Sequence, residues 1–250
     1  MKKQSKKFVL AGVVLLAIAG LLALTSCKND SVPEQGTSVQ EETWLQEQKK
    51  ELEGKTEGTI TAPSYLTKGG LVDLAKLLRD LPDGAQVDLD LSQATGLTYI
   101  AAGTFIDCFT LQSVKLPSSV TEIGPYAFAG SALTEVTIPE GVTTIGASAF
   151  ANTGLTEVTI PEGVTTIGGS AFVYTGLTEV TIPASVTTIG VSAFKGTDLT
   201  SVTFENKDGW HLQDPETNEI ADDPINVGTP STNAQQLRNG DWKFMNLIRK

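Results

Sequence analysis

The sequence predicts an α/β repeat protein, a solenoid with a parallel sheet on one face and a cap at each end. A period of 22 residues is marked by Leu111, Leu133, Leu155, Leu177 and Leu199. The segments between these leucines are nearly identical, since LTEVTIPEGVTTIGASAFANTG is followed by LTEVTIPEGVTTIGGSAFVYTG. An apolar helical pattern precedes the repeats, and a segment with scattered aromatic residues follows them. A fixed period of this length is typical of solenoids, in which each repeat buries its apolar side chains against its neighbours.

Each repeat opens with a segment in which apolar and polar residues alternate. This alternation predicts a half-buried strand over residues 134–138, with Val136 and Ile138 inward and Glu135 outward. Two apolar columns align when the repeats are stacked: Val114, Val136, Val158, Val180 and Val202, and then Leu116, Ile138, Ile160, Ile182 and Phe204. A proline without an N–H group should end each strand. These prolines are Pro117, Pro139, Pro161 and Pro183.

The second half of each repeat contains a short V-x-x-I segment, a glycine and an Ala-Phe pair. We expect a short extended segment, then a glycine that needs either a positive φ or a close backbone approach. These glycines are Gly124, Gly146, Gly168 and Gly190. We expect a short helical turn around Ala-Phe, with the phenylalanines stacked into a hydrophobic spine. They are Phe128, Phe150, Phe172 and Phe194.

These residues resemble the bacterial leucine-rich repeats of the BspA type, also called the Treponema pallidum class, whose consensus is close to LxxIxLPxxLxxIgxxAFxxC. The resemblance extends roughly from Gln86 to Phe204. The cysteine of that consensus is retained only as Cys108, and the other repeats have serine or threonine in its place. The first repeat fits only if the spacing slips, which is common in terminal repeats. The resemblance implies a leucine-rich-repeat solenoid and adhesion to host or extracellular-matrix proteins, or to other bacteria.

The start of the chain predicts a lipoprotein signal peptide over residues 1–26. Four lysines precede an apolar stretch from Phe8 to Leu24, and Leu24-Thr25-Ser26-Cys27 resembles a lipobox. We expect cleavage before Cys27 and lipidation of this residue, which would anchor the protein to a bacterial membrane. The alternative is an uncleaved membrane anchor, because 17 apolar residues almost span a bilayer. The expected location is the outer membrane or cell surface, with a periplasm-facing orientation as the alternative.

Composition restricts the partners. The formal net charge is −11, and removal of the four signal-peptide lysines leaves 14 basic against 29 acidic residues, a net charge of −15. Nucleic acid and anionic lipid are therefore disfavoured as partners. After lipidation of Cys27 only Cys108 remains, so we expect a buried thiol without a disulfide.

The segments on both sides of the solenoid, which we place at residues 87–205, differ in character. Residues 27–63 are polar and are expected to form the lipidated N-terminus and a flexible tether, with a short polar helix over residues 41–52. Residues 64–86 have leucines at helical spacing and predict an N-terminal helical cap. Residues 206–250 predict a C-terminal cap, with a short helix capped by Ser231 or Thr232 and a returning strand over residues 241–248.

Catalytic motifs are missing from the sequence. His211 is the only histidine, so histidine clusters for zinc and a Ser–His–Asp set are hard to assemble. We assign it a structural or solvent role in the cap. No phosphate loop, dinucleotide fingerprint or C-x-x-C motif occurs. The sequence therefore predicts no enzyme, cofactor or metal, although paired carboxylates leave catalysis open.

The outward positions of the strands form the candidate ligand-binding face. They are Glu135, Glu157 and Glu179, with Thr137, Thr159 and Thr181 beside them. Strand spacing should place the carboxylates about 4.8 Å apart, where each pair repels by roughly 1 kcal/mol in water-like surroundings. A repeated unfavourable column suggests capture of a basic protein segment or a cation. The alternative is that duplicated repeats copied their charges and threonines without selection for binding.

These observations leave several function hypotheses. The first is a membrane-tethered protein-binding module that acts in adhesion through its strand face. The second is a periplasmic structural or scaffolding lipoprotein without adhesin activity. The third is a carbohydrate-binding surface, which is weakened because Tyr126 and Tyr174 are the only tyrosines of the regular repeats.

Overall fold

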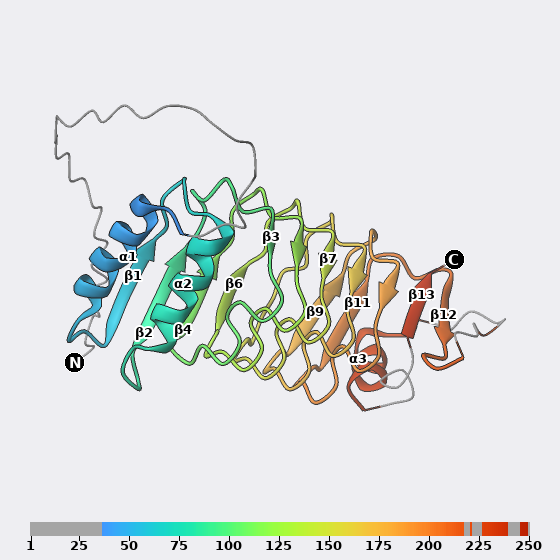
Figure 1. Ribbon diagram of the computed structural model, residues 1–250. Coiled ribbons are helices and arrows are strands. Elements are labelled where there is room, and N and C mark those ends of the chain that lie inside the picture. The colour runs from blue at the N-terminus through green and yellow to red at the C-terminus, as the bar shows by residue number, and fades with distance from the viewer. Residues whose placement is uncertain (1–36, 218–220, 222–226, 240–245, 250) are drawn as a thin grey trace, which may run out of the picture.

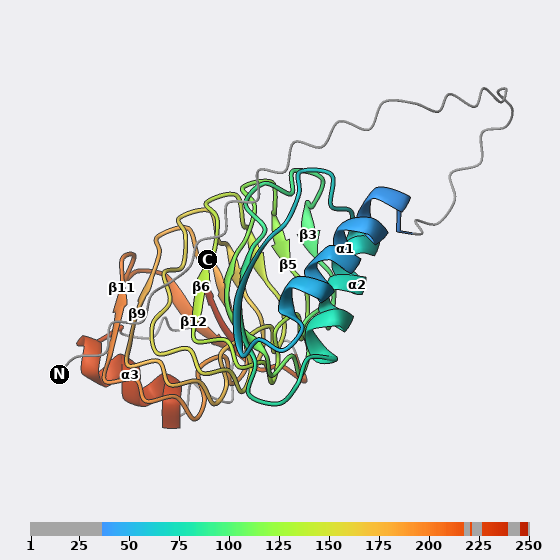
Figure 2. The same ribbon diagram turned by 90° about the vertical axis from the view of Figure 1, so that its left-hand side faces the viewer.

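The computed structural model describes residues 37–217, 221, 227–239 and 246–249. The predicted signal peptide and Cys27 lie outside the described residues. Over these ranges the chain forms an elongated solenoid, with two helices at its N-terminal end and a helix with two strands at its C-terminal end (Figure 1). The view from the N-terminal end shows the successive turns of the chain nested behind one another (Figure 2). The predicted solenoid with a parallel sheet is therefore confirmed.

The front sheet consists of the strands that open the repeats. Its strands are β1 (Glu57–Thr61), β2 (Gln86–Asp90), β4 (Leu111–Lys115), β6 (Glu135–Thr137), β9 (Glu179–Ile182) and β11 (Ser201–Phe204). The first four pair in the order β1-β2-β4-β6, and β9 pairs separately with β11, all in parallel. Residues 157–160, which occupy the equivalent place between β6 and β9, form no strand. The front sheet is thus interrupted in its middle, which the near-identity of the repeats did not predict.

The back sheet is continuous through all the repeats. It contains β3 (Tyr99–Ile100), β5 (Glu122–Ile123), β7 (Thr144–Ile145), β8 (Thr166–Ile167), β10 (Thr188–Ile189), β13 (Asn246–Arg249) and β12 (Trp210–Gln213). The first five strands are parallel, and β5, β7, β8 and β10 come from the predicted V-x-x-I segments, whereas β3 comes from the irregular first repeat. β13 pairs with β10 in the antiparallel direction and then with β12. The V-x-x-I segments therefore build the longer of the two ladders.

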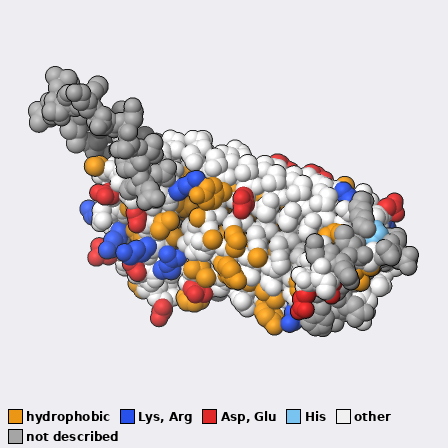
Figure 3. Space-filling view, turned by 45° about the vertical axis from the view of Figure 1, so that its right-hand side comes forward, with side chains coloured by type: hydrophobic (Ala, Val, Ile, Leu, Met, Phe, Trp, Pro, Cys, Tyr) orange, Lys and Arg blue, Asp and Glu red, His pale blue; other side chains and the backbone are white. Residues whose placement is uncertain are grey.

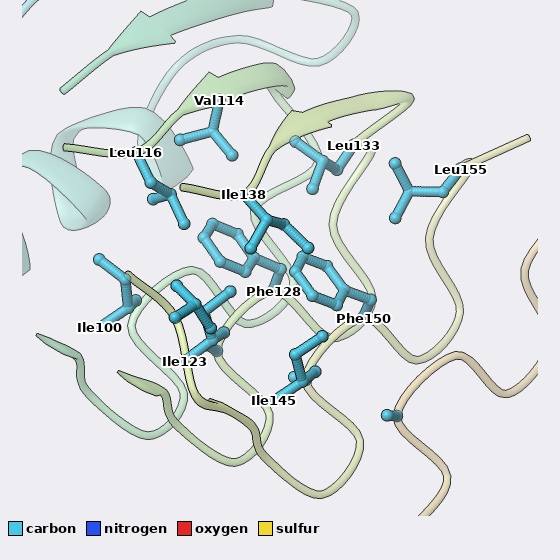
Figure 4. Packing of buried hydrophobic residues seen from close by; sticks show 14 of the residues in the cluster. Ile100, Val114, Leu116, Ile123, Phe128, Leu133, Ile138, Ile145, Phe150 and Leu155 are labelled. Carbon is cyan, nitrogen blue, oxygen red and sulfur yellow. The ribbon is translucent and has the colours of Figure 1, made fainter. Parts of the chain in front are cut away.

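The core lies between the sheets and is centred on a column of stacked phenylalanine rings. The column runs through Phe105, Phe128, Phe150, Phe172 and Phe194. Neighbouring ring centroids are 5.3–5.4 Å apart, and the ring planes differ by 1–9°. Figure 4 shows Phe128 and Phe150 between Ile138 of the front strand region and Ile145 of the back sheet. The predicted spine is confirmed, and it extends one repeat further, to Phe105.

The turns around Ala-Phe are not helical, which corrects the prediction. Backbone bonds there join positions three residues apart, such as Ala149 N to Gly146 O at 3.2 Å, and they also join neighbouring repeats, such as Phe150 N to Ala171 O at 2.8 Å. Each turn contains two residues with positive φ, four residues apart. They are Gly103 and Asp107, Tyr126 and Gly130, Ser148 and Asn152, Ser170 and Tyr174, and Ser192 and Gly196. The left-handed positions lie around Ala-Phe and not at the glycines after isoleucine.

Those glycines are needed for close packing. A Cβ atom at Gly146 would lie 2.6 Å from Pro125 N, which no side chain tolerates without a shift of the backbone. Of the two alternatives that the sequence left open, the close backbone approach is therefore correct.

The N-terminal cap is larger than predicted. Residues 37–63 do not form a tether, because α1 (Val39–Leu52) and β1 are part of the fold and β1 extends the front sheet. Trp44, Leu45 and Leu52 are buried, so these few apolar residues anchor an otherwise polar helix. The α2 helix (Lys68–Arg79) forms within the predicted helical cap.

A buried carboxylate joins the two helices. Glu41 is 0% exposed, and it accepts hydrogen bonds from Ser38 N at 2.8 Å and Thr67 N at 2.6 Å. Burial acts to raise the pKa of Glu41, but these hydrogen bonds outweigh it and hold the pKa below its usual value. Glu41 therefore caps α1 and binds the residue at which α2 begins.

The C-terminal end is closed by α3 (Pro230–Asn239) and by β12 and β13. Asn233 Nδ2 donates to Val202 O at 3.1 Å, so α3 caps the last front strand. The helix begins before Ser231 and Thr232, which therefore lie in its first turn and do not precede it as predicted. The described part of the predicted strand is β13, whereas residues 240–245 lie outside the described residues.

Two other predictions on single residues are settled by burial. His211 is 8% exposed, and its Nδ1 lies 2.8 Å from Ala221 O. Cys108 is fully buried, and burial raises the pKa of its thiol. The first repeat is irregular as expected, because the register between β2 and β4 shifts after Val87.

Candidate binding face

The outward side chains of the front sheet are exposed, as predicted. The set consists of Glu135, Glu157, Glu179, Thr137, Thr159 and Thr181. Strand register pairs Glu135 with Ser113 and Glu179 with Ser201. Because side chains of paired residues in parallel strands point to the same side, these positions form one column across the sheet.

Glu157 lies in the interruption of the front sheet. Among the described residues, no backbone hydrogen bond joins residues 157–160 to either flanking strand, and the nearest bond, from Thr178 N to Thr156 O, is 3.4 Å long. The regular strand spacing assumed for the three glutamates therefore does not apply at Glu157. The carboxylates of Glu135, Glu157 and Glu179 lie on one face, but the backbone hydrogen bonds of the sheet that supports them are interrupted at Glu157.

The acidic column extends further toward the N-terminus than the three glutamates predicted from the sequence. Asp88 pairs with Ser113, and Ser113 Oγ donates to Asp88 Oδ1 at 2.6 Å. Asp90 pairs with Lys115 in the neighbouring column. The alternation of Val87, Leu89 and Leu91 with these aspartates is visible in the sequence and would have assigned both to the outward side. We name the surface of Asp88, Asp90, Glu135, Glu157 and Glu179 the acidic face.

Hydroxyl ladders form on other threonines than those predicted for the face. Thr134 and Thr200 donate to the carbonyl groups of the preceding repeat at 3.2 Å. A second ladder lies beside the back sheet, where each hydroxyl again donates to the preceding repeat at 3.2 Å. Its members are Thr121, Thr143, Thr165 and Thr187. These threonines stabilise the stacking of repeats.

A second acidic cluster lies at the turn after the front strands. Glu140 and Glu162 occupy equivalent positions in two successive repeats, and Glu205 lies close to Glu162. A hydrogen bond with Glu205, burial and the nearby negative charges raise the pKa of Glu162. Glu205 Oε2 also accepts from Ala184 N at 3.0 Å. This cluster provides a comparison for the acidic face, because its three carboxylates are not among the residues that form that face.

Other kinds of site are not apparent. In residues 37–217 and the shorter described segments, no group of three or more acidic, histidine or cysteine side chains is arranged to hold a metal ion. No helix within the described ranges is both long and apolar enough to cross a membrane. A groove of about 610 Å³ lies between α1 and α2, with Leu45, Leu77 and Leu81 among its lining residues and charged residues of both signs around them.

Comparisons with known proteins find similar solved structures. A leucine-rich repeat protein from Bacteroides ovatus is 34% identical over 43% of this chain and 29% of that chain, with a TM-score of 0.42. The T. pallidum leucine-rich repeat protein is 32% identical over 58% of this chain and 63% of that chain, with a TM-score of 0.44. A leucine-rich cell surface protein from Faecalibacterium prausnitzii is 22% identical over 66% of this chain and 53% of that chain, with a TM-score of 0.41.

The chain spans less than two thirds of each of these three structures. No curated protein matches it. The family model of the BspA type leucine-rich repeat region matches in six copies over residues 98–208. Residues 98–208 are therefore a leucine-rich repeat region of the BspA type.

Proposed function

We propose that this protein is a membrane-anchored bacterial binding module that acts in adhesion to host or extracellular-matrix proteins, or to other cells. Its acidic face contacts a basic surface of the protein partner. Lipidated Cys27 holds the module at the outer membrane or cell surface. The module has no catalytic activity of its own.

The acidic face is the observation on which the proposal rests. Its carboxylates project from a sheet and are exposed or half-buried, and Lys115 is the only basic side chain in the strands that carry it. Complementary charge steers a basic partner toward such a surface and makes its association depend on ionic strength. The solenoid supplies a long, regular support, which is how repeat proteins commonly present their binding surfaces.

A charge-matched pair of variants tests the face. In the first variant Glu135, Glu157 and Glu179 are replaced by Gln, and in the control Glu140, Glu162 and Glu205 are replaced by Gln. Both lose three negative charges, but only the first changes the acidic face. Binding of each to immobilised fibronectin, laminin and collagen is measured at several salt concentrations.

The face variant should bind at least tenfold more weakly than the control, and its affinity should depend less on salt. Equal affinities of the two variants would contradict the role of the acidic face. Failure of the unmodified protein to bind any of the three would contradict the adhesion proposal.

The lipid anchor at Cys27 and the orientation of the protein in the envelope must be tested in intact cells. Replacement of Cys27 by Ser should move the protein from the membrane fraction to the soluble fraction and abolish incorporation of labelled palmitate. Protease added to intact cells should degrade the unmodified protein, while a periplasmic control protein stays intact. Full protection of the protein would instead favour the periplasmic scaffold.

A further inference from the structure

A second surface of the solenoid differs from the acidic face in having no charge. It is formed by the three central Ala-Phe turns, residues 124–132, 146–154 and 168–176, which we name the Ala-Phe flank. None of these residues is charged. Figure 3 shows a face of the molecule on which Lys and Arg gather near the N-terminal helices, while hydrophobic and uncharged side chains dominate the middle. Charged side chains lie only at its borders, with Asp107 beside Gly130 at one end and Lys195 in the turn after the other end.

Two tyrosines stand out on the Ala-Phe flank because they occupy left-handed backbone positions. Tyr126 and Tyr174 both have a φ of 56°. At the position of Tyr126 the other turns have Gly103, Ser148, Ser170 and Ser192. At the position of Tyr174 they have Asp107, Gly130, Asn152 and Gly196. Bulky side chains are unfavourable at positive φ, and such strain concentrates at functional sites.

Neither tyrosine contributes to the core. Tyr126 is 51% exposed and Tyr174 is 57% exposed, whereas the five phenylalanines of the spine are fully buried. The ring of Tyr174 lies against Gly196 of the next repeat, where any side chain would collide with it. Neither hydroxyl has a hydrogen-bond partner among the residues that the structure describes. The repeat architecture therefore holds two aromatic rings in solvent with their polar ends free.

The region between the two rings is polar but uncharged. The intervening turn has Ser148 and Asn152 at the two left-handed positions, and Asn152 is exposed. Tyr126 and Tyr174 lie two repeats apart, and the two repeat spacings along the phenylalanine column are 5.3 and 5.4 Å. A β-linked sugar advances along an extended glycan by a distance close to one such spacing. Two sugar units would therefore match the offset of two repeats between Tyr126 and Tyr174 along the solenoid, and the rings lie at different positions of their turns.

We propose that the Ala-Phe flank binds an extended, neutral, β-linked polysaccharide through Tyr126 and Tyr174. The apolar faces of sugar rings stack on tyrosine rings, while sugar hydroxyls bond with tyrosine hydroxyls and with the Asn152 amide. The absence of charge on the flank matches a neutral polymer. The open shape of the flank suits a chain that binds lengthwise along the solenoid.

Affinity electrophoresis in gels that contain barley β-glucan, birch xylan or konjac glucomannan tests this proposal. The unmodified protein should be retarded by at least one of these polymers. A variant with Tyr126→Ser and Tyr174→Asn should lose at least tenfold in affinity. It receives the residues that neighbouring repeats have at these positions, so it should unfold at the same or a higher urea concentration.

Three further variants separate the possible causes. Replacement of both tyrosines by Phe should retain most of the binding, because the rings remain. Tyr65→Ser with Tyr99→Ser, a matched loss of two exposed tyrosines elsewhere, should leave retardation unchanged. The Gln variant of Glu135, Glu157 and Glu179 should also be retarded normally, so failure of the proposed protein binding is distinguishable from failure of this proposal.

Two results would overturn the proposal. One is an unmodified protein that none of the three polymers retards, even if the tyrosines prove to be needed for binding a protein partner. The other is equal retardation of the Ser/Asn variant and the unmodified protein.

Discussion

The front and back sides of this solenoid contribute differently to its stability. On the back and Ala-Phe side the sheet is continuous from β3 to β12, and every phenylalanine of the spine stacks on the next. On the front side the sheet stops after β6 and resumes at β9. Val136 and Val158 are only half-buried there, whereas Val114, Val180 and Val202 are buried. The stability of the repeats should therefore come mainly from the back and the spine, which leaves the front side chains free to serve binding.

The largest expected effect comes from the spine. Replacement of Phe150 by Ala should lower the free energy of unfolding by about 3–5 kcal/mol, because it leaves a cavity between two stacked rings. The matched front substitution Val158→Ala should cost about 1 kcal/mol, since a half-buried side chain loses little transfer free energy. Urea unfolding followed by circular dichroism measures both. Equal losses of unfolding free energy in the two variants would show that the front and the back of the solenoid contribute alike to stability.

Amide exchange compares the two sides within one repeat without any mutation. The amides of residues 157–160 lack backbone partners among the described residues, whereas Thr166 N and Gly168 N bond to the preceding repeat at 3.3 and 2.8 Å. Exchange at the front segment should be about a hundredfold faster than at residues 166–168, because opening costs less there. Mass spectrometry of short peptic peptides resolves the two segments. Similar protection of the amides in both segments would mean that residues 157–160 form backbone hydrogen bonds with the neighbouring front strands in solution.

The left-handed turns should respond to substitution in opposite directions. Ser148 has a φ of 55°, so Ser148→Gly should raise the free energy of unfolding by about 1 kcal/mol. Ser148→Val should lower it by about 1–2 kcal/mol, because a β-branched residue is strained at positive φ. Urea midpoints measure both changes. A stabilising Val would show that the turn adopts another conformation in solution.

The two sides also differ in how far the sequence predicted them. The period and the apolar columns identified the solenoid, the Val114 and Leu116 columns and the phenylalanine spine, because burial forces side chains to repeat with the backbone. The interruption at residues 157–160 was not predictable, since these four residues are identical to residues 135–138 and 179–182 of the neighbouring repeats. Its cause therefore lies outside these four residues.

Local composition gave incorrect predictions for the N-terminal segment and for the Ala-Phe turns. Residues 37–63 have few apolar residues, yet Trp44, Leu45 and the buried Glu41 suffice to hold α1 in place. Ser and Tyr at left-handed positions give no warning in a sequence, because glycine is the residue by which such positions are usually recognised. In the candidate site, the glutamates and threonines were predicted correctly as outward residues. The interruption of the front sheet at Glu157 and Thr159 was not predicted.

The smallest expected effect concerns pH and the second acidic cluster at the end of the front strands. The hydrogen bond with Glu205, burial and the neighbouring charges raise the pKa of Glu162 in the folded state, so the folded protein holds a proton there more tightly than the unfolded chain. Stability should therefore fall as the pH rises through the raised pKa and recover as the pH is lowered. Glu162→Gln removes this dependence, so its stabilising effect in urea should be present near pH 7 and fade in mild acid. In a Glu205→Gln background the effect of Glu162→Gln on stability should vary little with pH, because the hydrogen bond between the Glu162 and Glu205 carboxyl groups is gone. An unchanged pH dependence in that background would show that the two carboxyl groups do not interact.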